Sequence, residues 1–233
     1  MMRIWMESME RFLLWRKRMV RPTNQRVQGF YPKDLYKFVC EDEKSMRYYL
    51  DAFGKTCKKI CITTIHSNKG TNVSAVVNRG LLEHQEMIDN ADKYGENSKV
   101  IICFDKDDND ITTIKAKMQE IKKLRQKYNS IASIYNSPCY EYWLLLHTRM
   151  TKQRFTSSQC CHETMRAINS HYHQSFEDLD KFKKAEKIFN ILGKDLPKAI
   201  RNAKSLNFTD DDLDGAYTNA HLIFEEIIKI EDR

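Results

Sequence analysis

The sequence lacks several features that would define its class at once. It has no apolar run approaching the ~18 residues that a membrane-spanning helix needs, and Glu7 and Glu10 interrupt the only apolar stretch near its start. We therefore expect neither a membrane partner nor a secretory signal. Its seven cysteines are odd in number and include no Cys-x-x-Cys pair. This argues against a disulfide framework and favours a reducing, cytoplasmic location.

Signatures of common cofactor and metal sites are missing as well. The chain contains no GxxxxGK phosphate loop, no GxGxxG dinucleotide fingerprint and no GxSxG hydrolase turn. Their absence argues against ATP hydrolysis by this chain alone, against a dinucleotide cofactor and against serine-hydrolase chemistry. Zinc-type side chains do occur in the second half, at Cys160, Cys161, His162, His171 and His173. Their spacing matches no usual structural zinc pattern, which disfavours a zinc site made of them.

What is present suffices for a substantial core. The chain has 233 residues, 41% of them hydrophobic, which suits one α/β domain or one such domain with a helical addition. Lys and Arg number 39 against 32 Asp and Glu, a formal net charge of +7. This excess fits a nucleic-acid partner as well as it fits a merely solvated basic surface. Composition alone leaves the partner open.

Apolar periodicity predicts an α/β core in residues 31–150. Short apolar runs of strand type alternate there with stretches of helical spacing. Strands are predicted at 35–40, 59–65, 100–104 and 130–135, and helices at 45–53, 72–92, 111–128 and 138–147. Strands separated by helices form parallel βαβ units with right-handed crossovers. We therefore predict a Rossmann-like parallel sheet flanked by helices.

The parts before and after this core are predicted to be helical. Residues 1–30 carry apolar side chains at helical spacing and then a basic stretch, which indicates a leading amphipathic helix and a basic linker. Residues 151–233 are predicted to form an all-helical extension packed on the core. Its clearest helices are expected at 182–192, 197–206 and 217–230.

Acidic side chains follow two of the predicted strands. Residues 41–43 follow the first strand, and residues 105–108 follow the apolar run at 100–104. The carboxyl ends of parallel strands meet at one edge of the sheet, where ligands bind. Asp105 and Asp107 would point to one side of a strand that stays extended, and such a pair suits Mg²⁺, which prefers oxygen ligands. The alternative is a solvated turn that caps the next helix.

Three stretches together resemble the RloB-like family. Phe38-Val-Cys-Glu-Asp-Glu-Lys-Ser45 is similar to that family's opening motif, and Cys103-Phe-Asp-Lys-Asp-Asp108 is similar to its aspartate motif. Asn136-Ser-Pro-Cys-Tyr-Glu-Tyr-Trp-Leu-Leu-Leu-His147 is similar to its Asn-Pro-Cys-Phe-Glu-x-Trp-Leu-Leu-Leu-His signature. The third stretch is the longest and the most specific. The resemblance extends from about Lys37 to Ile228.

This resemblance implies a Toprim-like fold, in which one glutamate and an Asp-x-Asp pair surround Mg²⁺ or Mn²⁺. The matching residues here are Glu41, Asp105 and Asp107, as metal ligands and catalytic residues. The implied function is a magnesium-dependent endonuclease of bacterial anti-phage defence, of the abortive-infection kind, that cleaves DNA or RNA. The implied partners are nucleic acid and an ATPase of the AAA or ABC type. The sequence leaves open whether the protein forms a homo-oligomer.

Further residues are candidates for the same site. Glu43 and Asp108 lie beside the expected ligands, and Lys44 and Arg47 are candidates to contact phosphates. Glu141 is a carboxylate within an apolar helix, which is costly to bury unless it is paired. It would either join the metal site or pair with a lysine, an arginine or the histidine at position 147. That histidine is expected to be a hydrogen-bonded core residue, and the basic face at 122–127 a solvated surface.

Departures from the family motifs support a second hypothesis. Asp42 stands where the motif has glycine, Ser45-Met46 replaces Thr-Glu, and Ser137 is inserted after Asn136, which would displace that asparagine. These changes leave open a weakened metal site, a site shifted to Glu43, or none. The chain would then be a non-catalytic nucleic-acid-binding or regulatory subunit with a degenerate Toprim site that works with the ATPase. Primase-like nucleotidyl transfer is a weaker third hypothesis.

Overall fold

The structure is a computed structural model. It describes residues 33–41, 44–67, 72–185, 187–209, 213 and 215–233. The predicted leading helix and basic linker at 1–30 and the candidate Glu43 lie outside these described residues. Within the described part, no helix is both long and apolar enough to cross a membrane.

The centre of the fold is a five-stranded sheet in the order β2-β1-β3-β4-β5. Its strands are β1 (Asp34–Cys40), β2 (Ile60–His66), β3 (Lys99–Asp105), β4 (Ile131–Ser137) and β5 (Tyr217–Thr218). The first four are parallel, and β5 pairs antiparallel with β4. The predicted α/β fold with a mostly parallel sheet is therefore confirmed, and each predicted strand lies within two residues of the observed one.

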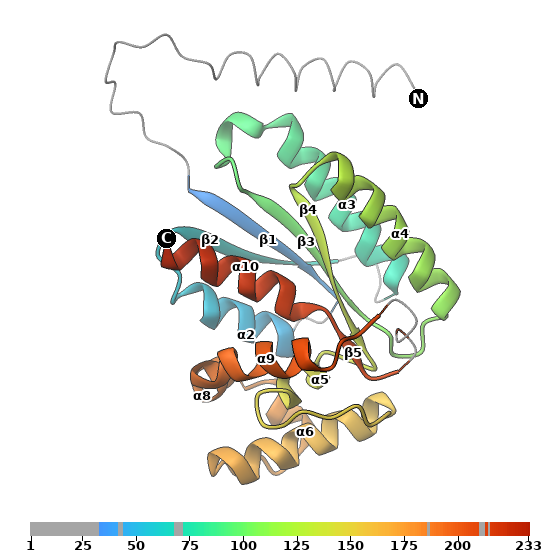
Figure 1. The fold of residues 1–233 in the computed structure, drawn as a ribbon, viewed down its shortest axis with the longest axis vertical. Helices are drawn as coiled ribbons and strands as arrows, with labels where there is room; N and C mark the ends of the chain where they lie inside the picture. Colours follow the sequence, from blue (N-terminus) through green and yellow to red (C-terminus); the bar gives the residue numbers. More distant parts are fainter. Residues whose placement is uncertain (1–32, 42–43, 68–71, 186, 210–212, 214) are drawn as a thin grey trace.

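Helices cover both faces of the sheet because its central strands are apolar on both sides (Figure 1). Ile101 and Cys103 of β3 pack in one cluster with α2 (Ser45–Gly54) and α10 (Ala220–Asp232). Ile102 and Phe104 point the other way and pack with α3 (Val73–Asp89) and α4 (Ile111–Lys127). Alternate residues of a strand face opposite sides of its sheet. A continuous apolar run therefore requires a layer of helices on each face.

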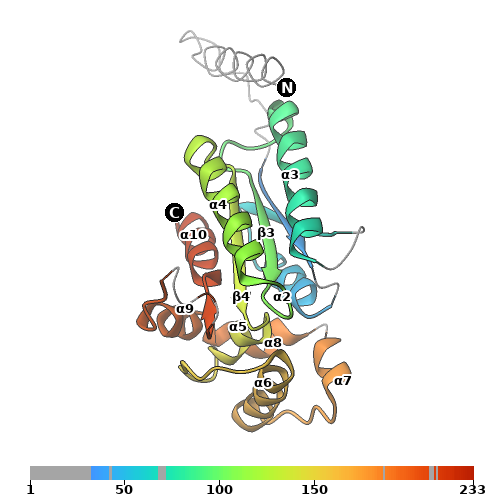
Figure 2. The ribbon, with the colours of Figure 1, turned by 90° about the vertical axis from the view of Figure 1, so that its right-hand side faces the viewer.

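The remaining helices follow β4 and gather beyond the carboxyl end of the sheet (Figure 2). They are α5 (Glu141–Leu145), α6 (Ser157–Tyr172), α7 (Leu179–Lys183), α8 (Ile188–Leu192) and α9 (Leu196–Ser205), with the short 3₁₀ turn η2 (Gly193–Asp195). A second 3₁₀ turn, η1 (Ala91–Lys93), lies between α3 and β3. Their apolar side chains belong to the same cluster as those of α2 and α10. The helical part thus shares a core with one face of the sheet.

Three details of the predicted secondary structure differ from the structure. The part at 151–233 is not all helical, because Tyr217 and Thr218 pair with Ser137 and Asn136 of β4 as a short strand. The helix predicted at 138–147 begins only at Glu141, because β4 runs on to Ser137. The single helix predicted at 182–192 is instead two short helices, α7 and α8. The first two differences lie at the end of β4, next to the predicted site.

Replacing Gly80 by alanine is expected to destabilise the contact between α3 and β3. A Cβ atom at Gly80 would lie 2.4 Å from Cγ1 of Ile102, which is fully buried. Overpacking of a filled core typically costs about 1–3 kcal/mol, which urea unfolding would measure. In an Ile102→Ala background the same change should cost clearly less. An equal cost in both backgrounds would show that the contact with Ile102 is not the cause.

Candidate metal-binding site at the carboxyl end of the sheet

The adjacent strands β1 and β3 bring two predicted site residues together. Cys40 and Cys103 are partners in the parallel register, so the residues that follow them lie at the same edge. The Glu41 backbone N–H donates to the carbonyl of Cys103 at 3.2 Å. The backbone N–H of Asp105 in turn donates to Oε2 of Glu41 at 3.3 Å. The Glu41 carboxylate therefore lies against the backbone of Asp105.

The Asp105 carboxylate is half-buried and held at both oxygens. Oδ1 accepts from Nδ2 of Asn136 at 2.9 Å, and Oδ2 accepts from the backbone N–H of Tyr140 at 3.0 Å. Oδ1 of Asn136 accepts from the hydroxyl of Thr218 at 2.7 Å. The strand β5 thereby orients Asn136, which contacts the site in spite of the inserted Ser137.

Asp107 does not continue the strand. Its φ of 37° places it in the left-handed region, which aspartate tolerates better than most residues, and its backbone N–H donates to the carbonyl of Pro138 at 2.8 Å. The side chain is exposed, and its Oδ1 accepts from Oγ of Ser157 at 2.5 Å. The expected same-side placement of Asp105 and Asp107 on an extended strand is therefore wrong. A turn at the strand end instead directs Asp107 to the start of α6.

Carboxylates nevertheless influence one another at this edge. Burial raises the pKa of Asp105 well above its usual range, and the nearby negative charges of Asp107, Glu141 and Glu41 add to that effect. The pKa of Asp107 is also raised, because its carboxylate is partly desolvated beside the sheet although the residue as a whole is exposed. The hydrogen bond from Ser157 opposes this effect, and Glu141 adds to it. A divalent cation placed among these groups would offset their mutual repulsion.

Glu141 is paired with a lysine. Its side chain is almost fully buried, and its Oε1 accepts from the Ser45 hydroxyl at 3.3 Å and lies 3.6 Å from Nζ of Lys183. Of the two alternatives for this carboxylate, pairing with a basic residue is therefore observed. A direct role in the metal site stays a prediction.

His147 is a core residue, as expected. It is fully buried, its Nε2 is 3.0 Å from the Tyr49 hydroxyl, and its Nδ1 is 3.1 Å from the carbonyl of Trp143. Burial lowers the pKa of His147 to about 4. The ring is therefore neutral at physiological pH and joins α5 to α2.

The other candidates lie at the surface around this edge. Asp108 is exposed and lines a cavity of about 570 Å³ together with Lys106, Asp107 and Ser157. Lys44 and Arg47 are exposed at the start of α2, where the Arg47 guanidinium lies 3.5 Å from Asp51. Lys122, Lys123, Arg125 and Lys127 are exposed on α4, as expected for a solvated basic face.

The three predicted metal ligands lie near one another but do not form a compact group. Among the described residues, Glu41, Asp105 and Asp107 do not form a group whose ligand atoms all lie within 4.8 Å of one another. Sequence reasoning did not anticipate the partners Tyr140, Ser157 and Thr218. A backbone N–H and two isolated hydroxyls give no sequence signal for such contacts.

The fold and the site define an α/β protein with carboxylates at the carboxyl ends of adjacent parallel strands. A family model described as RloB-like protein matches residues 36–227. Because this match spans most of the chain, the protein belongs to the RloB-like family. Searches of curated proteins and of solved structures each found no match.

Proposed function

We propose that this protein is a Mg²⁺- or Mn²⁺-dependent nuclease with a Toprim-like site. The observation that carries this proposal is the contact between Glu41 and Asp105 across two adjacent parallel strands, with Asp107 following in the next turn. The donors are all oxygen atoms, which suits a hard divalent cation. Each Asp105 oxygen accepts one hydrogen bond and keeps a lone pair for a cation.

The chemistry would be hydrolysis of a phosphodiester. The bound cation would supply charge stabilisation at the phosphate and lower the pKa of an attacking water. Asp105 and Asp107 would be the residues that hold this cation, and Glu41 would move a proton to or from the attacking water or the leaving oxygen. The raised pKa of Asp105 reflects a site that disfavours uncompensated negative charge.

Ser157→Ala is expected to raise the affinity for Mg²⁺ by up to about tenfold. Its hydroxyl holds the Asp107 carboxylate toward α6, and a hydrogen bond to a charged group contributes about 1.5–3 kcal/mol, less at an exposed position. Loss of this bond frees Asp107 to turn toward Asp105. Ser158→Ala, in the same cavity wall, is the matched control and should change nothing. Weaker Mg²⁺ binding after Ser157→Ala would contradict this view of Asp107.

Lys44 and Arg47 would contact the phosphates of the nucleic acid. Replacing both with alanine should weaken binding similarly for every sequence and reduce the slope of log K against log salt by about two. Filter binding or fluorescence anisotropy at several salt concentrations would measure both effects. Lys122→Ala with Lys123→Ala removes two exposed basic residues from α4 and should leave the slope unchanged. Equal effects of the two double variants would contradict a specific role for Lys44 and Arg47.

A cleavage assay tests the proposal. The purified full chain is incubated with DNA and with RNA in the presence of Mg²⁺, Mn²⁺ or a chelator, and cleavage is expected with a cation only. Asp105→Asn and Glu41→Gln should abolish it. Asp110→Asn should not, because Asp110 caps α4 through the backbone N–H of Thr113 and lies outside the carboxylate group. Cleavage that survives Asp105→Asn would refute the assigned site.

A regulatory subunit is the second candidate, and one observation favours it. The Asp107 carboxylate is bound by Ser157, and the three expected ligands are not gathered. In this case the protein would work through a partner ATPase in anti-phage defence, as the family resemblance implies. Bacteria that express both proteins would then stay protected from phage when Asp105 and Asp107 are both changed to alanine. Loss of protection would favour the nuclease.

A further inference from the structure

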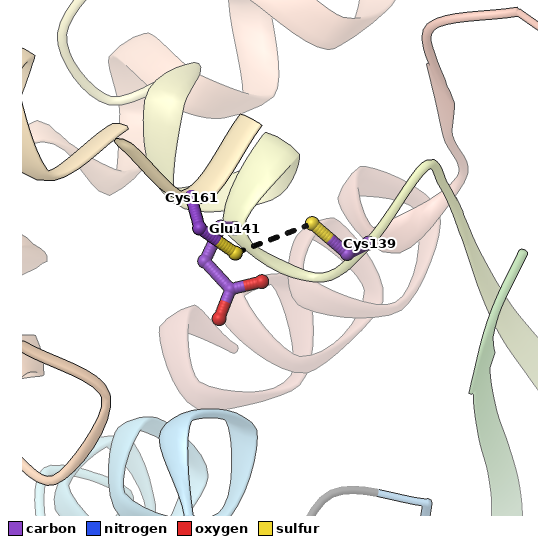
Figure 3. A group of neighbouring side chains, drawn as sticks. All are labelled: Cys139, Glu141 and Cys161. Carbon is purple, nitrogen blue, oxygen red and sulfur yellow. Dashed lines mark hydrogen bonds between the residues drawn. The ribbon is translucent and has the colours of Figure 1, made fainter. Parts of the chain in front are cut away.

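A second group of ligand-type side chains lies between the β4–α5 turn and α6. Cys139, Glu141 and Cys161 are all buried, and one ligand atom from each lies within 4.8 Å of the others. Figure 3 shows the two thiols turned toward each other with the Glu141 carboxylate beside them. The two sulfur atoms are 4.0 Å apart. Sequence spacing gave no sign of this group, since Cys161 comes from another helix.

We propose that Cys139, Glu141 and Cys161 form a zinc site. Zinc binds thiolates at about 2.3 Å in tetrahedral geometry, which places two sulfur ligands about 3.8 Å apart. The observed separation of 4.0 Å needs little movement to reach that value. Two thiolates and one carboxylate suit Zn²⁺ better than Mg²⁺, which prefers oxygen atoms alone. The fourth position of the ion remains for a water or a further ligand.

Binding of zinc to this group would be coupled to the release of protons. A hydrogen bond with Cys160 and burial raise the pKa of Cys139 well above its usual range, and a hydrogen bond with Cys139 and burial raise the pKa of Cys161. Zinc binds cysteine as the thiolate, so its binding would release the protons of both thiols. The alternative is that the sulfurs merely pack as small apolar groups, in which case Ser45 and Lys183 are the partners that compensate the buried Glu141 beside them.

The zinc ion would displace the Lys183 ammonium group from the Glu141 carboxylate. It lies 3.6 Å from Glu141, and its side chain is 40% exposed while that of Glu141 is 3% exposed. The ammonium can therefore swing into solvent when a cation takes its place beside the carboxylate. The pairing with Lys183 shows that this buried carboxylate needs a positive partner.

The zinc site would support the carboxylate edge. It would join the turn after β4 to α6, the helix that also supplies Ser157. Cys139 precedes Tyr140, whose backbone N–H holds Oδ2 of Asp105. Zinc would thereby fix the turn on which Asp105 depends. This inference rests on different side chains from those of the proposed nuclease site, apart from the nearby Glu141.

Metal analysis and cobalt substitution of the reduced full chain test this proposal. We expect about one zinc per chain after dialysis against a weak chelator, and a sulfur-to-cobalt charge-transfer band when Co²⁺ replaces it. Cys139→Ser and Cys161→Ser should each weaken binding by at least about 100-fold, which exceeds typical effects of second-shell changes. Cys57→Ser removes a half-buried thiol at the end of α2 and is the matched control.

The outcomes separate this site from the nuclease proposal. Asp105→Asn should keep the bound zinc, and Cys161→Ser should keep Mg²⁺ binding at the carboxylates. If the serine variants do not fold, the cobalt spectra of the folded wild type and of the Glu141→Gln variant are used instead to test whether the metal binds at this group. A wild-type chain without the charge-transfer band, or serine variants that bind zinc as tightly as the wild type, would overturn the zinc site.

Discussion

Mg²⁺ is expected to raise the melting temperature of the wild-type protein by about 5–10 °C at neutral pH, and to leave that of Asp105→Asn unchanged. A ligand at about 100 times its Kd stabilises the folded state by about 2.7 kcal/mol. For a chain of about this size, each kcal/mol corresponds to about 2–4 °C. Differential scanning calorimetry with and without Mg²⁺ measures the shift. Asp110→Asn is the control and should respond to Mg²⁺ as the wild type does.

The stability of the protein and its stabilisation by Mg²⁺ are both expected to depend on pH. The pKa values of Asp105 and Asp107 are raised in the folded state, so folding favours their protonated forms. Stability without metal should therefore fall as pH rises from the ordinary aspartate pKa of about 3.9 through the raised values. Mg²⁺ binds the ionised carboxylates, so its stabilising effect should grow over that pH range. A Mg²⁺ shift that is equal in acid and at neutral pH would contradict binding at these aspartates.

Trp143→Ala is expected to lower the free energy of unfolding by about 3–5 kcal/mol, as truncation of a buried aromatic residue does. Trp143 is fully buried in α5 and stacks on Phe224 of α10, with ring centroids 5.1 Å apart and planes 1° apart. It also contacts the ring of His147 edge to face. The side chain therefore joins the signature segment at 136–147 to the last helix.

Urea unfolding followed by circular dichroism measures this loss. Leu222→Ala in α10 is the control, because Leu222 is 48% exposed and such surface changes fall within about 0.5 kcal/mol. Trp143→Phe should cost less than Trp143→Ala, since an aromatic ring is kept against Phe224. A loss below about 1 kcal/mol for the alanine variant would contradict the packing described for α5 and α10.

The central strands and the carboxylate edge could be predicted because both follow from strong, local patterns. The run at 100–104 is apolar at every position, so it had to be buried on both faces, and parallel topology then places Glu41 and Asp105 at one edge. The family motifs gave the same residues independently. Periodicity also located α2, α3, α4 and the four parallel strands to within a few residues.

The parts that could not be predicted depend on tertiary contacts. The strand β5 has two residues, and only its pairing with β4 distinguishes it from the helix that follows. The acidic run after β3 allowed either an extended strand end or a turn that caps the next helix, because aspartate occurs in both, so the sequence could not decide that Asp107 turns away from Asp105. Cys139 and Cys161 lie 22 positions apart and meet only because α6 packs beside the β4–α5 turn. Spacing rules for zinc ligands do not detect such a pair.

The most direct test of the proposed function is a calorimetric titration of Mn²⁺ and Mg²⁺ into the wild type and into the Asp105→Ala, Asp107→Ala double variant. We predict saturable binding to the wild type that is lost in the double variant, while circular dichroism shows both to be folded. Equal binding by both would place the cation elsewhere and contradict the site. A wild type that binds neither cation, alone or with nucleic acid present, would contradict the metal-dependent nuclease and favour the regulatory subunit.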